Sequence, residues 1–274
     1  MGFLTIMKIL ITGSKGFVGT HLTNRLKKNN EIVSFDLKEG RDILNEELLN
    51  KHLKEVDLVI HLAAFVDGNE SWKKPETYLI NNGLGTYKVI KCAIKNKVKR
   101  IIVFSSAAVY GSPLTPYGAS KMWAEAAARS YSDQIEIIIV RPFNIYGKGQ
   151  NPIYGYVINN FSKGITENGK VYIYGTGNQT RDFIYIEDVI SIVEKLMTSK
   201  VPTKPIDLGT GKETKIKDLA EIIGKILQKK YKINYLKERI EPLKSRANVI
   251  MLKEMNFKPE EFTKIEDGLK LLIK

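Results

Sequence analysis

The stretch Met7-Lys-Ile-Leu-Ile-Thr-Gly13-Ser-Lys-Gly16-Phe-Val-Gly19 joins a short apolar strand to the start of a helix through a glycine-rich turn. Glycines in such a turn permit a tight bend, let backbone N–H groups approach a phosphate and let the helix pack close to the strand. A strand, turn and helix in this order are typical of the start of a dinucleotide-binding sheet. The alternative is an ordinary turn, since the chain has 21 glycines.

The rest of the chain alternates between short β-branched runs and amphipathic segments of helical length. We expect strands at 7–12, 31–35, 58–62, 100–105 and 136–141, and helices at 17–29, 45–54, 75–95 and 117–130. Such alternation predicts a parallel sheet covered by helices on both faces. Later segments predict helices at 186–198, 216–229 and 263–272 and a strand at 205–208.

We therefore predict an α/β fold, a Rossmann-type doubly wound parallel sheet with a smaller C-terminal α/β lobe. The dinucleotide-binding domain is expected at 1–145, with 182–211 returning to it. The lobe that binds the substrate is expected to comprise 146–181 and 212–274.

An acidic residue, Asp36, ends the second expected strand. A carboxylate at this place hydrogen-bonds ribose hydroxyls and repels a 2′-phosphate, so NAD is favoured over NADP. Lys38 weakens this preference slightly. Asp42, just before Ile43, either reaches the adenine edge or caps the following helix.

Ser105-Ser106-Ala107-Ala108 ends the fourth expected strand, and Tyr117 and Lys121 follow at the start of a helix. Residues four apart share one helix face, so we expect Lys121 to lower the pKa of the Tyr117 phenol. A tyrosine with a lowered pKa can act as a base near neutral pH. Tyr87 and Lys91 have the same spacing without a preceding hydroxyl, and we interpret them as helix surface.

Composition narrows the classes of function. The net charge of +13 comes from scattered lysines without interleaved aromatic residues, which favours solvated faces over nucleic-acid binding. A mildly positive cleft for an anionic substrate fits the same charge. The single cysteine, Cys92, excludes internal disulfides and multi-cysteine metal sites, and we expect no metal.

The N-terminal segment and the apolar runs bear on location. No apolar run approaches the roughly 20 residues that span a bilayer. The start lacks a basic region ahead of its apolar residues, so it is interpreted as a strand and not a signal peptide. We expect a cytoplasmic protein without membrane association, and Met7 is as good a start as Met1.

With the turn, Asp36, Ser106, Tyr117 and Lys121 in this order, the chain resembles the extended short-chain dehydrogenase/reductase family. Within that family it resembles the NAD-dependent nucleotide-sugar epimerase/dehydratase branch, nearest to the UDP-hexose 4-epimerases. Further motifs carry the resemblance: His61-Leu-Ala-Ala64, Asn81-Asn82, Arg141-Pro-Phe-Asn144-Ile-Tyr146-Gly147, Arg181-Asp182-Phe183 and Asp207-Leu-Gly-Thr-Gly211.

The resemblance implies a role for each matching residue. The catalytic residues would be Ser106, Tyr117 and Lys121. Residues that contact NAD would be Gly13, Gly16, Phe17, Val18, Gly19, Asp36, Asp42, Ile43, Leu62, Ala63, Ala64, Asn82, Tyr117 and Lys121. Residues that contact the nucleotide sugar would be Ser106, Asn144, Arg181, Arg239, Glu241 and Ser245. For His61, Asp182 and Asp188 we prefer roles in packing and loop geometry.

The resemblance also implies a reaction. Tyr117 would take the proton of the sugar 4-hydroxyl while C4 gives a hydride to NAD, and the 4-keto sugar would regain the hydride on its opposite face. Related 4,6-dehydratases carry Asp-Glu where this chain has Ala107 and Ala108, so we expect C4 epimerisation of UDP-glucose and UDP-galactose. A small Ser245 would also admit N-acetylhexosamine forms.

Other interpretations stay open. They are a 4,6-dehydratase, another enzyme that forms a 4-keto sugar nucleotide, and a dinucleotide-sensing protein without catalysis. The loop 111–116 is shorter than in relatives, so the substrate mouth would differ. By the same resemblance, helices 75–95 and 117–130 would form a homodimer interface, to which Ile90, Ile94, Trp123 and Ala127 could contribute.

Overall fold

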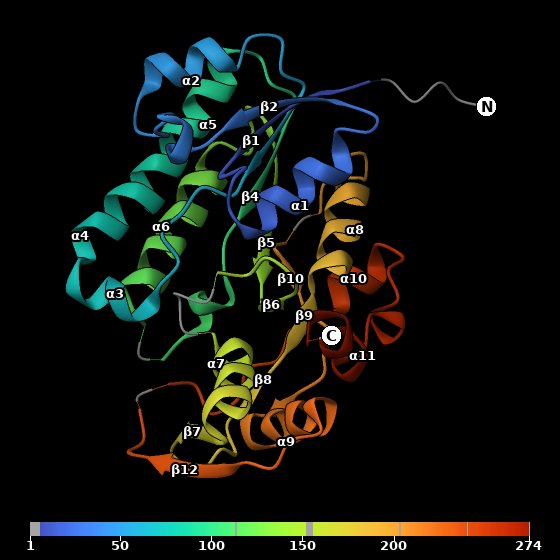
Figure 1. Ribbon diagram of the computed structural model, residues 1–274. Coiled ribbons are helices and arrows are strands. Elements are labelled where there is room, and N and C mark those ends of the chain that lie inside the picture. The colour runs from blue at the N-terminus through green and yellow to red at the C-terminus, as the bar shows by residue number, and fades with distance from the viewer. Residues whose placement is uncertain (1–5, 113, 152–155, 203, 240, 274) are drawn as a thin grey trace. The chain divides into compact units, whose positions relative to one another are not determined.

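The computed structural model describes residues 6–112, 114–151, 156–202, 204–239 and 241–273 (Figure 1). Two compact units make up the chain: Met1–Arg141 with Ile190–Ile206, and Pro142–Val189 with Asp207–Lys274. The segment that returns to the first unit is therefore 190–206, where the sequence suggested 182–211. The choice between Met1 and Met7 as the start concerns Met1, which lies outside the described residues.

A six-stranded sheet has the order β10-β5-β4-β3-β1-β2. Neighbours from β2 to β5 pair in parallel, as predicted. Ile9, Leu10, Val59, Ile102 and Val103 are fully buried in it, which is typical of parallel strands covered on both faces. The strand bounds are β1 (Lys8–Thr12), β2 (Glu31–Phe35), β3 (Leu58–His61), β4 (Arg100–Phe104), β5 (Glu136–Pro142) and β10 (Ile206–Leu208).

Helix α1 covers one face of this sheet, and α2, α5 and α6 cover the other (Figure 1). The doubly wound α/β fold is thereby confirmed. The helices are α1 (Phe17–Leu26), α2 (Glu46–His52), α3 (Gly68–Lys73), α4 (Pro75–Tyr78), α5 (Gly85–Lys95), α6 (Pro116–Ser130) and α8 (Ile186–Leu196). Two 3-10 turns, η1 (Leu37–Glu39) and η3 (Ala107–Tyr110), follow β2 and β4.

The helix expected at 75–95 is interrupted. Its middle is a π-helical turn, η2 (Leu79–Leu84), between α4 and α5. The turn packs on α6, where a Cβ added to Gly83 would lie 2.1 Å from the Trp123 ring. Glycine at this position leaves room for the Trp123 ring, a tertiary contact that helical periodicity does not reveal.

The second unit has its own apolar core, which includes Phe161, Ile173, Leu219 and Leu269. Three two-stranded sheets pair β6 with β9, β7 with β12 and β8 with β11. Its strands are β6 (Asn144–Tyr146), β7 (Lys170–Tyr174), β8 (Thr180–Arg181), β9 (Phe183–Tyr185), β11 (Thr214–Lys215) and β12 (Lys232–Leu236). Its helices are α7 (Val157–Lys163), η5 (Gly164–Asn168), α9 (Ile216–Leu227), α10 (Ile250–Glu254), η6 (Pro259–Glu261) and α11 (Ile265–Ile273).

The short strands of the second unit were not predicted, because runs of two or three residues carry no readable alternation. Within the described ranges, no helix combines the length and the apolar composition that crossing a membrane requires.

Candidate active site

The glycine turn between β1 and α1 has no room for side chains. Gly13 has a φ of +71°, and a Cβ there would lie 2.8 Å from the backbone nitrogen of Ala63. A Cβ on Gly19 would lie 2.1 Å from the Gly13 carbonyl oxygen. The turn therefore needs glycine at both places, for a left-handed backbone and for close helix packing.

Helix α1 begins without a side-chain cap. Gly16 is its N-cap residue and offers no side-chain acceptor, and no acidic residue lies in the first turn, where Phe17 and Val18 follow. The N–H groups of a helix start attract anions, since the helix dipole and the unpaired donors act together. This start therefore fits the pyrophosphate of a dinucleotide.

Asp36 is nearly buried, with 7% of its surface exposed. One carboxylate oxygen accepts from the backbone N–H of Lys15 at 2.9 Å, and the other accepts from that of Lys38 at 2.9 Å. These two bonds tie the glycine turn to the end of β2. Each oxygen keeps a lone pair with which to accept from a ribose hydroxyl, so the residues present fit NAD.

The two alternatives for Asp42 can be compared with the local contacts. Its carboxylate accepts from the N–H of Leu44 at 2.8 Å. The N-cap of α2 is Asn45, whose side chain accepts from Leu48. Asp42 therefore does not cap α2, and its contact with adenine stays a prediction. Ile43 beside it lies in the core, 4% exposed.

Ser106, Tyr117 and Lys121 come together where β4 ends and α6 begins. The Ser106 hydroxyl accepts from the N–H of Ala108 at 3.1 Å and is hydrogen-bonded to the Tyr117 phenol. The Lys121 ammonium donates to the Phe104 carbonyl oxygen at 2.8 Å. The three predicted catalytic residues therefore occupy one place.

The electrostatics of this place differ from the sequence expectation. Burial raises the pKa of the Tyr117 phenol, although the hydrogen bond with Ser106 opposes the rise. Burial also lowers the pKa of Lys121 to about 8, with Glu125 acting in the other direction. The sequence led us to expect that Lys121 would lower the pKa of the phenol. In the structure the pKa is raised instead, because desolvation of the phenolate has a larger effect than the groups that would lower the pKa.

Glu125, one turn beyond Lys121 on α6, was missed by the sequence reasoning. One of its oxygens accepts from Ser105 Oγ at 2.6 Å and from Arg141 Nε at 2.7 Å, and the other accepts from Arg141 Nη2 at 2.6 Å. Arg141 in turn donates to the Tyr110 hydroxyl at 2.6 Å. Burial opposes ionisation of Glu125, but the bonds from Arg141 and Ser105 hold its pKa below the ordinary value.

This ion pair joins α6 to the ends of β4 and β5 and places a fixed anion near Lys121. The signal that could have found Glu125 is the i, i+4 spacing already applied to Tyr117 and Lys121.

His61 is buried at the end of β3, and its hydrogen bonds fix its tautomer. Thr86 Oγ1 donates to the Asn82 carbonyl oxygen at 2.6 Å, so it must accept from His61 Nε2 at 2.8 Å. The other ring nitrogen, Nδ1, then accepts from Thr12 Oγ1 at 2.7 Å. Burial, assisted by the charge of Lys121, lowers the pKa of His61 to about 3, so the ring is neutral.

The loop after β3 is held by Thr12 and Asn82. Thr12 Oγ1 accepts from the N–H groups of Leu62 and Ala63 at 3.1 and 3.2 Å. The Asn82 amide donates to the Phe65 carbonyl at 2.9 Å and to Ser120 Oγ at 3.0 Å, and its oxygen accepts from the Phe65 N–H. The segment through Ala64 is thereby fixed. A contact between Asn82 and phosphate, which stays a prediction, would require one of these bonds to be exchanged.

In the second unit, the structure brings Arg181, Arg239 and Glu241 together. Arg181 pairs with Glu241 and donates to the Pro242 carbonyl at 2.9 Å. The Arg239 guanidinium lies 3.7 Å from the centre of the Tyr174 ring. Burial lowers the pKa of Arg181 and the nearby charge of Arg239 adds to the effect, whereas Glu241 opposes it.

Asn144 and Asp182 order the loops next to this group. Asp182 is fully buried, and its carboxylate accepts from the N–H groups of Thr210, Gly211 and Ala247. The Asn144 amide donates to the Asp182 carbonyl at 2.9 Å. The preferred interpretation of Asp182 as a loop-fixing residue agrees with these contacts. Ser245 is partly buried in the segment that leads to Ala247.

Asp188, also interpreted as a geometric residue, accepts from the N–H of Thr263 at 3.0 Å. Among the residues that the structure describes, no group of three or more His, Cys, Asp or Glu side chains is placed to hold a metal ion.

Comparisons with known proteins show the family of this chain. A family model described as "NAD dependent epimerase/dehydratase family" matches residues 9–209. A putative UDP-glucose 4-epimerase of Methanocaldococcus jannaschii is 30% identical over 305 residues, covering 97% of either chain. A dTDP-D-glucose 4,6-dehydratase of Dictyostelium discoideum is 32% identical over 271 residues, covering 80% of this chain and 62% of its own length.

Among solved structures, the UDP-N-acetylglucosamine 4-epimerase of Methanobrevibacter ruminantium in complex with UDP-N-acetylmuramic acid superposes with a TM-score of 0.91. It is 28% identical to this chain, and the match covers 98% of both. Relatives named as decarboxylases match at 27% and 28% identity. The similar proteins thus divide among epimerases, dehydratases and decarboxylases of nucleotide sugars.

Proposed function

Because the chain belongs to the NAD-dependent epimerase/dehydratase family, we propose that it is a UDP-sugar 4-epimerase that acts through a transient 4-keto sugar. The observation that carries the proposal is the Ser106, Tyr117 and Lys121 group without an acid at positions 107 and 108. Membership of the family indicates an enzyme that modifies nucleotide sugars with NAD. The C4 epimerisation is our inference.

The residues of the first unit divide the work of holding the cofactor. The glycine turn and the start of α1 would hold the pyrophosphate, and Asp36 the adenosine ribose. Lys121, which keeps two further N–H donors beyond the one given to Phe104, would hold the nicotinamide ribose. When bound, NAD supplies a reversible hydride acceptor beside this group.

Tyr117 would take the proton from the sugar 4-hydroxyl and return it at the end of the reaction. Burial makes the phenolate costly, so Ser106 must donate to it and Lys121 must supply positive charge nearby. Ser106 would also hydrogen-bond the sugar oxygen. The base is then generated only where these partners are in place.

Elimination of water needs a further acid and base near the sugar C5 and C6, and loss of CO2 from C6 leaves an enolate that needs a proton donor near C5. In this chain the 3-10 turn that follows Ser106 presents Ala107 and Ala108, which cannot exchange protons. This supports epimerisation over the dehydration and decarboxylation carried out by other relatives.

The substrate class follows from the second unit. Arg181 and Arg239 supply two guanidinium groups suited to a diphosphate, and Glu241 can accept from ribose hydroxyls. Asn144 is proposed to lie beside the sugar. The small Ser245 supports room for an N-acetyl group, and one similar structure is that of a UDP-N-acetylglucosamine 4-epimerase. We propose UDP-glucose and UDP-galactose, and their N-acetylated forms, as substrates.

A homodimer is part of the proposal. Large apolar side chains stay exposed on α3, η2 and α6, with 61% of Trp72, 46% of Ile80, 49% of Met122 and 43% of Trp123 accessible. Patches of this kind on helix faces mark protein contacts. Ile90 and Ala127 are instead buried within the unit. Light scattering of Trp72→Lys against the wild type tests the dimer, and an unchanged mass would contradict this surface.

The reaction is tested by incubating the purified protein with UDP-, GDP- and dTDP-sugars and following the products by NMR. The expected product is the C4 epimer of a UDP-sugar, formed without net oxidation. A 4-keto-6-deoxy product or a pentose product would replace the proposal by dehydration or decarboxylation. No turnover of any sugar, with NAD still bound, would favour a dinucleotide-sensing protein.

The N-acetyl specificity needs its own variant. Ser245→Tyr should reduce the rate with UDP-N-acetylglucosamine while UDP-glucose is still converted. If wild type and variant are equally inactive on the N-acetylated sugar, Ser245 does not set this specificity.

A further inference from the structure

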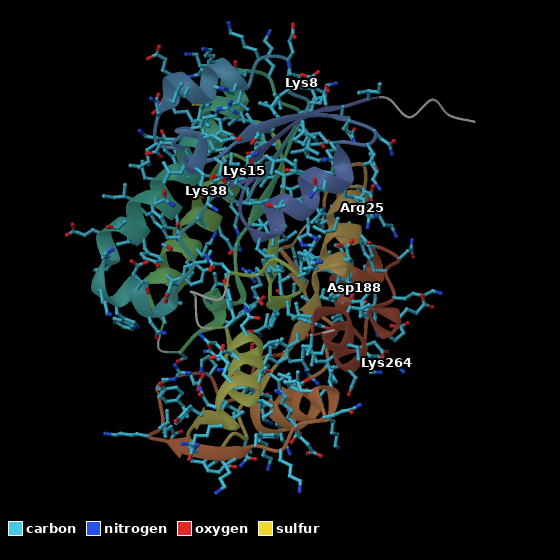
Figure 2. All side chains as sticks on the ribbon, in the orientation of Figure 1. Lys8, Lys15, Arg25, Lys38, Asp188 and Lys264 are labelled. Atoms are coloured by element: carbon cyan, nitrogen blue, oxygen red, sulfur yellow. The ribbon has the colours of Figure 1, made fainter. Side chains whose placement is uncertain are left out.

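Besides the carboxylate of Asp36, positively charged side chains lie at the end of β2. Lys15 and Lys38 lie next to each other here (Figure 2), and the Lys38 ammonium donates to the Lys15 carbonyl at 3.3 Å. Arg41 donates to the carbonyl oxygen of Ser34 in the same strand. Three cations therefore surround the place where Asp36 would meet the adenosine ribose. Such a set would attract a 2′-phosphate.

Glu39 forms ion pairs with two of these cations. Its carboxylate lies 3.1 Å from the Lys15 ammonium and 3.3 Å from the Arg41 guanidinium, one oxygen for each. The same carboxylate accepts from Ser34 Oγ at 2.8 Å, and Ser34 Oγ is hydrogen-bonded to Ser14 Oγ in the glycine turn at 2.6 Å. Glu39 is therefore fixed to the turn and to β2.

We propose that Glu39 is a specificity-determining residue that keeps Lys15 and Arg41 from binding the 2′-phosphate of NADP. Asp36 repels the phosphate directly. Both of its oxygens already accept backbone N–H groups, so part of its charge is offset. Glu39 completes the discrimination by neutralising the cations that would otherwise compensate for Asp36. The preference for NAD thus comes from two carboxylates with different tasks.

The inference rests on the proposed cofactor site and is independent of which sugar the enzyme converts. Cofactor binding is therefore the readout, measured by calorimetry on nucleotide-free protein with NAD and NADP in turn. Because no sugar is present, the result stands whether or not epimerisation is observed, and the two proposals can fail separately.

Glu39→Gln keeps an acceptor for Ser34 and removes the charge. We expect NADP to bind about three- to tenfold more tightly and NAD to change by less than about twofold, as for one partly exposed charge near a phosphate. The gain should shrink in high salt, where exposed charges are screened. Adding Lys15→Gln should remove part of the gain, since the freed Lys15 ammonium and the freed Arg41 guanidinium share it.

Glu221→Gln is the matched control, because it removes an exposed carboxylate paired with Lys225 on α9 and changes the net charge equally. It should leave both affinities unchanged. A Glu39→Gln protein whose ratio of NADP to NAD affinity equals that of the wild type overturns the inference. Equal weakening of both cofactors also overturns it, since Glu39 would then only support the fold of the site.

Discussion

Two helices of the first unit each carry a tyrosine and a lysine four residues apart, yet only one pair has the surroundings that chemistry needs. On α5, half of the Lys91 side chain is exposed and pairs with Glu46 at 3.0 Å, while Tyr87 contacts the Tyr131 ring. On α6, Lys121 is 5% exposed and donates to a backbone carbonyl. Equal spacing gives a shared face, whereas burial and neighbours decide what the face can do.

The pKa values of the two lysines are shifted in opposite directions. The hydrogen bond that Lys91 donates to Glu46 raises the pKa of Lys91 on the surface. Burial lowers the pKa of Lys121 to about 8. The difference shows that burying the charge of Lys121 on α6 lowers the stability of the fold, whereas the exposed pair on α5 carries no such cost. Substitutions in or next to the α6 pair, with the α5 pair as a control, test this difference.

The largest expected effect is on turnover. Tyr117→Phe should lower kcat for the proposed epimerisation by about 1000-fold, because a general acid-base group contributes roughly 10² to 10⁴. Tyr87→Phe, which removes the same atom from the α5 pair, should stay within about twofold of the wild type. Both are measured by NMR with UDP-glucose. Equal rates for the two variants would break the contrast.

The second effect separates activity from stability. Lys121→Met should lower kcat/KM by about 100-fold, since it removes the cation beside the phenol. It should also stabilise the fold at pH 7 by roughly 2 kcal/mol. The fall of the pKa from 10.5 to about 8 means that the buried charge costs about 3 kcal/mol, and loss of the hydrogen bond to Phe104 offsets about 1 kcal/mol of the gain. Below pH 8 the charge costs its full amount, and the cost disappears as the pH rises from 8 to above 10.5.

Urea unfolding across this pH range measures the stability term. Lys91→Met is the control and should change neither activity nor the pH dependence of unfolding between pH 8 and 10, since the raised pKa of Lys91 acts only at higher pH. A Lys121→Met protein that is less stable than the wild type at pH 7 and shows the same pH dependence would contradict the burial cost.

Much of this contrast could be predicted from the sequence. The strands β1 to β5 are apolar β-branched runs bounded by turns, and Ser106, Tyr117 and Lys121 follow from strand-end and helix spacing. The direction of the Tyr117 pKa shift was predicted wrongly, because desolvation depends on tertiary burial and spacing does not report it.

The supports of the site were also not predicted. Glu125 and Arg141 meet only when α6 lies against β5, and the Trp123 ring packs against Gly83 of the π-helical turn. Glu39 was missed because its partner Lys15 lies in the glycine turn, far from it in the sequence. The contacts of Lys15 with Glu39, of Arg141 with Glu125 and of Trp123 with Gly83 join separate segments, and local patterns carry no signal for them.

A third effect contrasts two neighbouring serines at the end of β4. Ser106→Ala should lower kcat by about 30-fold, because Ser106 is hydrogen-bonded to the phenol. Ser105→Ala removes a buried bond to Glu125 and should cost about 1 kcal/mol of stability with activity changed by less than about threefold. Turnover and urea unfolding on both variants test the division. Matching losses of activity would show that the two hydroxyls share one role.

The last expected effect is in acid stability and concerns the buried side of the contrast. His61 is linked through Thr86 to Asn82, which contacts Ser120 on α6 beside Tyr117. Its pKa falls from an ordinary 6.5 to about 3, so the folded state resists protonation. Stability from this group is therefore complete above pH 6.5 and is lost as the pH falls toward 3, at about 1.4 kcal/mol per pH unit.

His61→Gln removes the titrating ring, so the free energy of unfolding should fall less steeply between pH 6.5 and 4.5 than in the wild type, by about the effect of one proton. The variant starts from a lower stability at pH 7, because its hydrogen bonds are fewer, and only the slope is compared. Lys91→Met should keep the wild-type slope, since its pair lies on the surface. If His61→Gln also keeps that slope, the ring is protonated in the folded protein, and the buried network behind Tyr117 is more open to water than its contacts imply.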